Sequence, residues 1–239
     1  MSVELSVIIP AYNEEERLEN TLSEVDAYLD TRPYAAEILV IDDGSTDGTP
    51  EILRRLSAAM PRLRVMTHRI NSGKGLAVKD GIREARGRLC LFLDADGSTP
   101  MSEWDAFEKA FAAGARAVIA SRHLPGSRIV RPQPPARRIL GTGYRNLCKG
   151  LFGLRCSDFN CGYKAYETAL AKEVYAEVEM LDWTFDVEVM ARLRRRGVRV
   201  VELPVTWRHC DKRSGLPPVR TAVRMLSSLA RLRRTLGGR

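Results

Sequence analysis

Short apolar runs alternate along this chain with longer segments in which apolar residues recur every three or four positions. The runs end at Gly, Pro, Ser or Asp, which is typical of strands buried on both faces of a sheet. The predicted strands cover residues 5–9, 38–41, 64–67, 89–93, 117–121 and 198–205. Strands separated by helical segments form βαβ units. The pattern therefore predicts a single α/β domain with a mostly parallel sheet flanked by helices.

The helical segments carry their own start signals. Leu18, Leu22, Val25 and Leu29 fall on one helical face, and Asn13 followed by Glu16 has the form of a capping box before them. Thr49 before Pro50 predicts the cap of a second helix. Further helices are expected after residue 75 and at 103–113, 139–151 and 185–195.

Two stretches of the second half are less regular. Residues 124–135 contain four prolines and predict an ordered, non-helical loop that can move over a site. Residues 158–166 have the composition of a strand. We expect residues 1–216 to form the domain and residues 217–239 to form a basic amphipathic helix. That helix has two alternatives, either lying in a membrane interface or docking on the core of the protein.

Composition narrows the partners of the 239-residue chain. Its formal charge of +8 favours anionic partners such as nucleotides, phospholipid surfaces or nucleic acid. No run of eighteen apolar residues and no signal peptide is present, so a cytoplasmic location is expected. Five cysteines without a Cys-x-x-Cys pair argue against a disulfide framework and a zinc site. His68, His123 and His209 lack ligand spacing and are expected on the surface or in loops.

Acidic residues follow the predicted strand at 89–93. In extended backbone, Asp94 and Asp96 would point to the same side, roughly 6–7 Å apart. Two neighbouring carboxylates repel, and a hard cation whose shell is completed by phosphate oxygens relieves that repulsion. The pair therefore indicates a metal–nucleotide site, and the alternative is a surface turn with two solvated acids.

Other polar segments are predicted at the same edge, because ligands bind beyond the carboxyl ends of parallel strands. Asp42 and Asp43 can accept hydrogen bonds from a base or ribose, and Lys74 lies between two glycines at a helix N-terminus, which favours phosphate. Neither a Walker A loop nor Gly-x-Gly-x-x-Gly is present. The segments expected to share one cleft are 10–13, 42–47, 71–75 and 94–97.

These motifs, in their order and spacing, resemble the GT-A glycosyltransferases of family 2. The matching segments are Ser-Val-Ile-Ile-Pro-Ala-Tyr-Asn-Glu from Ser6, Asp-Asp-Gly-Ser-Thr-Asp-Gly-Thr from Asp42, Gly-Lys-Gly from Gly73, and Asp-Ala-Asp-Gly from Asp94. Later segments resemble the dolichyl-phosphate glucosyltransferase and dolichyl-phosphate mannose synthase group. They are Asp-Phe-Asn-Cys-Gly-Tyr-Lys from Asp158, Trp-Thr-Phe-Asp-Val-Glu from Trp183 and Glu-Leu-Pro-Val-Thr-Trp from Glu202. The resemblance spans roughly residues 4–216.

The resemblance implies a role for each matching residue. Mg²⁺ or Mn²⁺ would be bound by Asp94 and Asp96, most directly by Asp96, while Asp158 would lie near the reacting sugar. The nucleoside would be held by Pro10, Tyr12, Glu14 and Asp42, with Asp43 nearby. The acceptor phosphate would bind at Ser121 and Arg122. Arg208, Lys212 and Arg213 would close on the diphosphate.

The expected reaction is metal-dependent transfer of a hexose, with inversion, from a sugar nucleotide to a polyprenyl phosphate. UDP-glucose is the first donor expected and GDP-mannose the second. Lys74 would help neutralise the leaving charge. The enzyme would act peripherally at the inner face of the cell membrane, without nucleic acid as substrate. The alternatives are a family 2 enzyme with a saccharide acceptor and a non-catalytic binding module.

The roles of three further acids stay open at this stage. Asp158 would orient the acceptor or stabilise positive charge on the sugar, and the alternative is a buried acid paired with Lys164 or Arg155. Asp186 and Glu188 lie two residues apart in a predicted helix and therefore on different faces. One of them is expected to contact sugar hydroxyls and the other to be structural.

Overall fold

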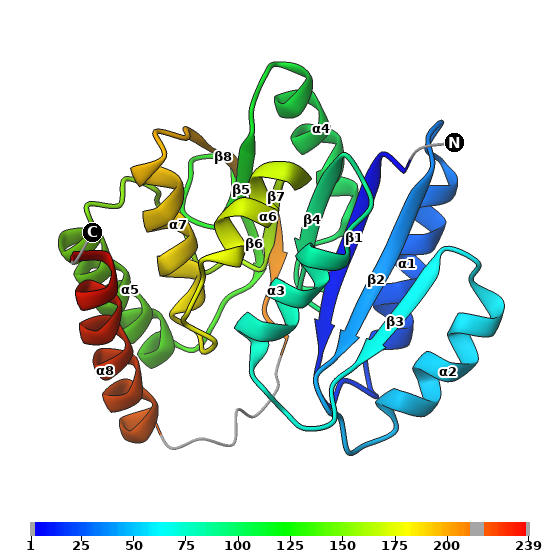
Figure 1. The fold of residues 1–239 in the computed structure, drawn as a ribbon, viewed down its shortest axis with the longest axis horizontal. Helices are drawn as coiled ribbons and strands as arrows, with labels where there is room; N and C mark the ends of the chain where they lie inside the picture. The colour runs from blue at the N-terminus through cyan, green and yellow to red at the C-terminus, as the bar shows by residue number, and fades with distance from the viewer. Residues whose placement is uncertain (1–2, 211–217, 238–239) are drawn as a thin grey trace.

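A seven-stranded sheet forms the centre of the protein, and helices cover both of its faces (Figure 1). The computed structural model describes residues 3–210 and 218–237, with side chains in the last helix from residue 227. The strand order is β3-β2-β1-β4-β7-β5-β8. The strands are β1 (Leu5–Ala11), β2 (Ala36–Asp42), β3 (Leu63–Thr67), β4 (Leu89–Leu93), β5 (Ala117–Ser121), β7 (Tyr163–Glu167) and β8 (Val200–Pro204).

Helices on the two faces bury two apolar cores. One core packs under α1 (Leu18–Asp30), α2 (Thr49–Ala59) and α4 (Trp104–Ala112), with the short 3₁₀ turn Met101–Glu103 before α4. The other core involves α3 (Lys74–Glu84), α5 (Pro135–Phe152), α6 (Thr168–Ala176), α7 (Phe185–Arg195) and α8 (Pro218–Gly237). Strands β1, β4 and β5 are buried along their whole length, which explains their continuous apolar runs.

Parallel pairing brings the polar ends of several strands to one edge of the sheet. β1 lies between β2 and β4, with Ala11 opposite Asp42 and Ile8 opposite Phe92. β1 continues past the predicted end at residue 9, because its pairing with β2 extends to Ala11 although its pairing with β4 stops at Ile8. The prediction of a mostly parallel sheet is confirmed. The exception is β7, which runs antiparallel between β4 and β5.

The predicted caps of the first two helices are wrong. α1 begins at Leu18 without a side-chain cap, and Asn13 instead adopts a positive φ of 53°. The Asn13 backbone N–H donates to Ser45 Oγ, and its Oδ1 accepts from the Thr46 N–H. Thr49 is the first residue of α2 rather than its cap, and its Oγ1 accepts from the Glu14 N–H. These side chains join the loops after β1 and β2, which local sequence spacing does not reveal.

Three elements have no counterpart in the predicted pattern. The proline-rich stretch contains β6 (Arg128–Arg131), which pairs in parallel with β9 (Thr206–Arg208) in a second, two-stranded sheet. Helix α6 follows β7 directly. The predicted strand at 158–166 is shortened to β7, and the residues before it form loops.

The described part of α8 docks on the protein. Leu229, Leu232 and Leu236 are buried in the same core as α3 and α7, and Ser228 Oγ donates to Asp182 Oδ2 at 2.6 Å. The two alternatives for this helix were a membrane interface and the core of the protein. Residues 227–237 dock on the core. Among the described residues, no helix combines the length and the apolar character needed to cross a bilayer.

We expect Leu232→Ala to lower the free energy of unfolding by about 2–5 kcal/mol, because Leu232 is fully buried and its loss leaves a cavity. Leu140→Ala is the matched control, since Leu140 is 64% exposed on α5. Urea denaturation of both variants checks this. Equal stabilities for the two variants would mean that α8 does not contribute to the core.

Candidate active site

The Asp43 carboxylate fixes the turn that carries Lys74. Asp43 Oδ1 accepts from the Ser72 N–H at 2.9 Å, and Oδ2 accepts from the Gly73 N–H at 2.8 Å. His68 Nδ1 lies 2.7 Å from Asp43 Oδ1, while its Nε2 lies 3.2 Å from Asp80 Oδ2. The loop after β2 and the turn before α3 are therefore held together through one buried carboxylate.

Lys74 crosses from this turn to the end of β4. Its Nζ donates to Asp94 Oδ1 at 2.5 Å and lies about 5 Å from the ring centroids of Phe92 and Trp183. Burial lowers the pKa of Lys74, but the charges of Asp94 and Asp186 outweigh it and raise the pKa above its usual value. Lys74 therefore remains a cation at the rim.

The two glycines beside Lys74 permit close packing of another segment. The Gly75 N–H donates to the Leu181 carbonyl at 3.0 Å, and a Cβ at Gly75 would lie 2.8 Å from Leu181 Cα. A methyl group there has no space, since the neighbouring atoms belong to the backbone. This packing brings the half-exposed Trp183 beside Lys74, a contact between residues 109 positions apart that no local pattern predicts.

The metal-site prediction fits the charge distribution around Asp94 and Asp96. The expected extended geometry is not observed, because β4 ends at Leu93 and residues 95–96 form a turn. The two acids nevertheless interact, since burial and the Asp94 charge raise the pKa of Asp96. No group of three or more acidic, His or Cys ligands exists among the described residues. Two carboxylates suit a cation that completes its shell with substrate phosphates.

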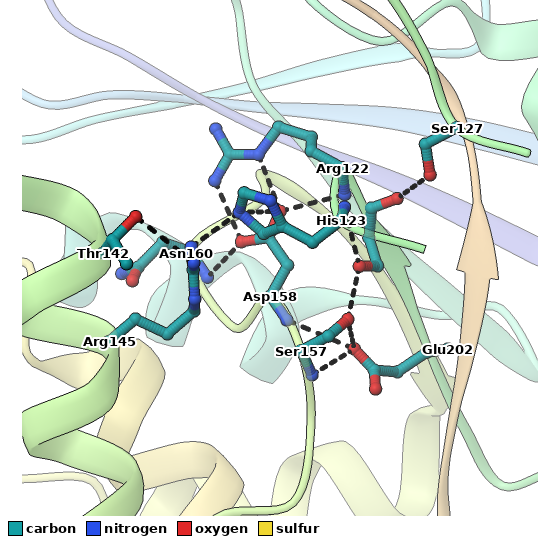
Figure 2. Close-up of polar contacts among 10 residues, drawn as sticks. Arg122, His123, Ser127, Thr142, Arg145, Ser157, Asp158, Asn160 and Glu202 are labelled. Carbon is teal, nitrogen blue, oxygen red and sulfur yellow. Dashed lines mark hydrogen bonds and ion pairs between the residues drawn. The ribbon is translucent and has the colours of Figure 1, made fainter. Parts of the chain in front are cut away.

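A second charged cluster lies at the end of β5 (Figure 2). Asp158 Oδ2 accepts from the Arg122 N–H at 3.0 Å and from Nε at 2.7 Å, and Oδ1 accepts from Nη2 at 2.9 Å. Asp158 is buried, which raises its pKa, but the bonds and charge of Arg122 dominate and lower the pKa to about 2. The alternative pairing of Asp158 with Lys164 or Arg155 is therefore wrong.

Hydrogen bonds behind this pair hold it in place (Figure 2). Glu202 Oε1 accepts from the Ser157 N–H at 2.6 Å and from the Asp158 N–H at 3.2 Å. Ser121 is fully buried, and its Oγ lies 2.6 Å from Ser157 Oγ. Of the predicted phosphate pair, only Arg122 keeps exposed side-chain surface, 17% of it. The sequence could not show that Glu202 is bonded to this loop.

His123 connects the cluster to α5. Its Nε2 lies 2.6 Å from Arg145 Nη1, so the ring nitrogen accepts from the guanidinium (Figure 2). Burial and the nearby arginines lower the pKa of His123. All three histidines lie outside helices and strands, as expected, but only His123, which is 41% exposed, lies at the surface, whereas His68 and His209 are largely buried. His209 is buried and stacks on Trp207.

A buried ion pair lies behind Lys74. Lys164 Nζ donates to Asp186 Oδ1 at 2.7 Å, and both side chains are almost inaccessible to solvent. Burial raises the pKa of Asp186, against the opposing charges of Lys164 and Lys74. Glu188 accepts from the Met180 N–H and pairs with Arg192 at 2.6 Å. Glu188 thus has a structural role, and Asp186 lies nearer the rim.

The remaining predicted residues occupy different positions around the rim. Pro10 is buried in β1, while Tyr12 is 41% exposed and Glu14 pairs with Arg17. The Arg208 N–H donates to the Ser98 carbonyl at 2.9 Å, so this residue lies beside the loop that follows Asp96. Lys212 and Arg213 lie outside the described residues.

The two charged clusters adjoin one another. The loop 158–162 joins them: Asp158 at its start binds the Arg122 guanidinium, and the Gly162 carbonyl at its end accepts from the Asp94 N–H at 3.0 Å. A ligand at Asp94 and Asp96 and a second anion at Arg122 would therefore be neighbours.

Comparisons with known proteins place the chain in one family. A family model described as Glycosyl transferase family 2 matches residues 6–174. A dolichyl-phosphate beta-glucosyltransferase from Trichomonas vaginalis is 32% identical, with 88% of this chain and 67% of the relative covered. One from Dictyostelium discoideum is 31% identical, with 97% and 74% covered.

Solved structures match over nearly the whole chain. Glucosyl-3-phosphoglycerate synthase from Mycobacterium tuberculosis, in complex with Mn²⁺, UDP and phosphoglyceric acid, superimposes with a TM-score of 0.71. Its sequence identity is 18%, and the match covers 98% of this chain and 78% of that structure. The predicted GT-A-like α/β fold and the predicted family resemblance are both confirmed.

We expect Asp158→Asn to cost about 3–5 kcal/mol of stability at neutral pH, because Arg122 would remain buried without its counter-charge. In the wild type, the folded pKa of Asp158, about 2, lies below the unfolded value of 3.8. Its contribution is therefore present above about pH 5 and falls by roughly 2 kcal/mol as the pH approaches 2.

Urea denaturation across this pH range tests the assignment. The acid-dependent loss expected in the wild type should be missing in Asp158→Asn. Glu51→Gln serves as a control, because it breaks an exposed ion pair with Arg54 and should leave the pH profile unchanged. Identical pH profiles for wild type and Asp158→Asn would contradict the role given to this ion pair.

Proposed function

The chain belongs to glycosyl transferase family 2, and from this premise we propose that it transfers a hexose from a sugar nucleotide to a polyprenyl phosphate. The first donor proposed is UDP-glucose, because the relatives at 31–32% identity are named dolichyl-phosphate beta-glucosyltransferases. GDP-mannose is the second. The chain spans about two thirds to three quarters of those relatives, so the lipid acceptor is part of the proposal.

The donor half of the proposal is supported by the rim residues of β1, β2 and β4. The nucleoside would contact Pro10, Tyr12, Glu14 and Asp42. Asp43 would act through the backbone of the Lys74 turn, since both of its carboxylate oxygens already accept from that turn. Lys74, which remains protonated beside Asp94, would neutralise part of the diphosphate charge.

A divalent cation fits the two acids that follow β4. Asp94 and Asp96 would hold Mg²⁺ or Mn²⁺, because a cation would offset the burial and the Asp94 charge that raise the pKa of Asp96. When bound, the cation supplies positive charge to the leaving diphosphate. Arg208, beside the loop of Ser98, would approach the same diphosphate.

The acceptor half is supported by Arg122. Its guanidinium is held by Asp158 and retains exposed surface, which suits an anionic phosphate. Asp158, with a pKa of about 2, is a poor proton acceptor and would position Arg122 instead. The buried Ser121 would support the same loop through Ser157.

The reaction needs little acid–base help from the protein. A phosphate oxygen of the acceptor attacks the anomeric carbon, and the bond from that carbon to the diphosphate oxygen breaks, which gives inversion. A phosphate monoester is already anionic at neutral pH, since its second pKa is about 6. The work of the site is to position two anions and to balance their charge.

The observation that carries the proposal is that one short loop, residues 158–162, contacts both Arg122 and Asp94, which would bring donor diphosphate and acceptor phosphate together. The test incubates purified protein with UDP-glucose or GDP-mannose, Mg²⁺ or Mn²⁺, and a polyprenyl phosphate. A lipid product heavier by one hexose is expected. Sugar transferred only to water-soluble glycan would overturn the acceptor assignment, and binding without transfer would indicate a non-catalytic module.

Gly162→Ala provides a sharp probe of Asp94. A Cβ at Gly162 would lie 1.9 Å from Asp94 Oδ2, so one methyl group must displace the carboxylate. We expect turnover to fall by about 100-fold, while the fold is retained, because only a short side chain has to move. Gly150→Ala is the control, since its Cβ would meet no atom within 4 Å.

Turnover is measured with the lipid-product assay, and folding is measured by thermal unfolding. Asp96→Asn should reduce turnover to a similar degree without the steric change. Full activity in Gly162→Ala would remove Asp94 from the proposed site.

A further inference from the structure

The first half of α5 is covered by no other described part of the protein. All nine residues from 135 to 143 are exposed, and burial begins only with Tyr144 and Cys148. Isolated helices of this length are marginal in water, and most helices in proteins are stabilised by packing of one face. The exposed half of α5 therefore lacks the contact that normally stabilises a helix.

Among the residues whose side chains the structure describes, the most exposed large apolar ones include several from α5 and β6. Ile139 is 73% exposed, Leu140 is 64% exposed and Val130 is 56% exposed. Leu147 and Ile129 are each 39% exposed. Ile139 and Leu147 lie eight residues apart and so share one side of the helix, whereas Leu140 continues the side of the buried Cys148 beyond the point where the core ends. We call Ile139, Leu140 and Leu147 the α5 surface.

The charge of this region has one sign. Residues 122–155 contain eight Lys or Arg residues and no Asp or Glu, and the formal charge of the whole chain is +8. Arg137 and Arg138 directly precede Ile139 and Leu140, and both are exposed. Exposed apolar side chains next to arginines are typical of helices that lie in the headgroup region of a membrane.

We propose that the α5 surface docks on an anionic phospholipid bilayer. Ile139, Leu140 and Leu147 insert among the acyl chains near the headgroups, and Arg137 and Arg138 contact lipid phosphates. A second copy of this chain is a poorer occupant, because it would bring two stretches of the same charge together. Nucleic acid would match the charge but leave the apolar side chains in water.

The surface is connected to the second charged cluster. Arg145, in the same helix, reaches back to His123 next to Arg122. The inference rests on the proposed function in this respect, since a lipid-linked phosphate embedded in the bilayer would approach Arg122 from the side that α5 occupies. α5, rather than α8, is then the helix that meets the membrane, because α8 packs its leucines into the core.

Flotation with vesicles tests the proposal. The wild type should float with vesicles of phosphatidylcholine and phosphatidylglycerol, and much less with phosphatidylcholine alone. Ile139→Asn/Leu140→Asn should bind the anionic vesicles about tenfold or more weakly, since two apolar side chains are lost. Arg137→Gln/Arg138→Gln should lose roughly fivefold per arginine, and only with anionic vesicles.

Ile70→Asn is the matched control, because Ile70 is also 73% exposed but lies after β3. It should float like the wild type. The proposal is overturned if the wild type does not float, or if the Ile139/Leu140 variant floats as the wild type does. A dimer in light scattering that this variant dissociates would also overturn it, in favour of a second copy.

The vesicles contain no polyprenyl phosphate, so the flotation assay tests membrane docking independently of hexose transfer. Flotation without any hexose transfer would leave the membrane surface standing and refute the proposed function. Transfer to a short, water-soluble prenyl phosphate should be retained in the Ile139/Leu140 variant, with unchanged thermal unfolding. Loss of that transfer together with loss of flotation would point to misfolding or a role in the site, and against a docking role.

Discussion

The contact between Lys74 and Asp94 joins the parts of this protein that act together. Lys74 is placed by the Asp43 carboxylate and by the close packing of Leu181 on Gly75, while Asp94 is held against the backbone of Gly162. Each constraint comes from a different crossover of the sheet. The contact therefore forms only when the parallel register of β1, β2 and β4 is correct.

Charges alternate along the network that extends from this contact. Three cations, Lys74, Lys164 and Arg122, face three acids, Asp94, Asp186 and Asp158. Burying any one of them alone would be very unfavourable, so pairing is a condition of the fold. Asp96 is a fourth acid beside this set, and its burial together with the charge of Asp94 raises its pKa.

The sequence predicted well those features that depend on the spacing of apolar residues and on the Gly, Pro, Ser or Asp residues that end each apolar run. Apolar runs located all the strands of the parallel core, and the position of Asp94 after such a run located the rim. Contacts between side chains and distant backbone could not be predicted in this way. Asn13 has the sequence signature of a helix cap and instead joins two loops, and Glu202 accepts from the backbone N–H of Asp158, 44 residues away. Nothing local encodes these partners, because they are brought together only by the sheet.

The amphipathic helices α5 and α8 also have partners that the local sequence does not reveal. Both α5 and α8 carry apolar side chains together with arginines, and removing those apolar side chains from water is favourable whether protein or lipid covers them. Periodicity therefore reveals that a face must be covered but not by what. In the folded chain Leu232 is fully buried whereas Leu140 is 64% exposed, although both belong to basic helices. The leucines of α8 are thus covered by the core of the protein. The apolar side chains of α5 still face solvent, beside the arginines that would attract an anionic surface.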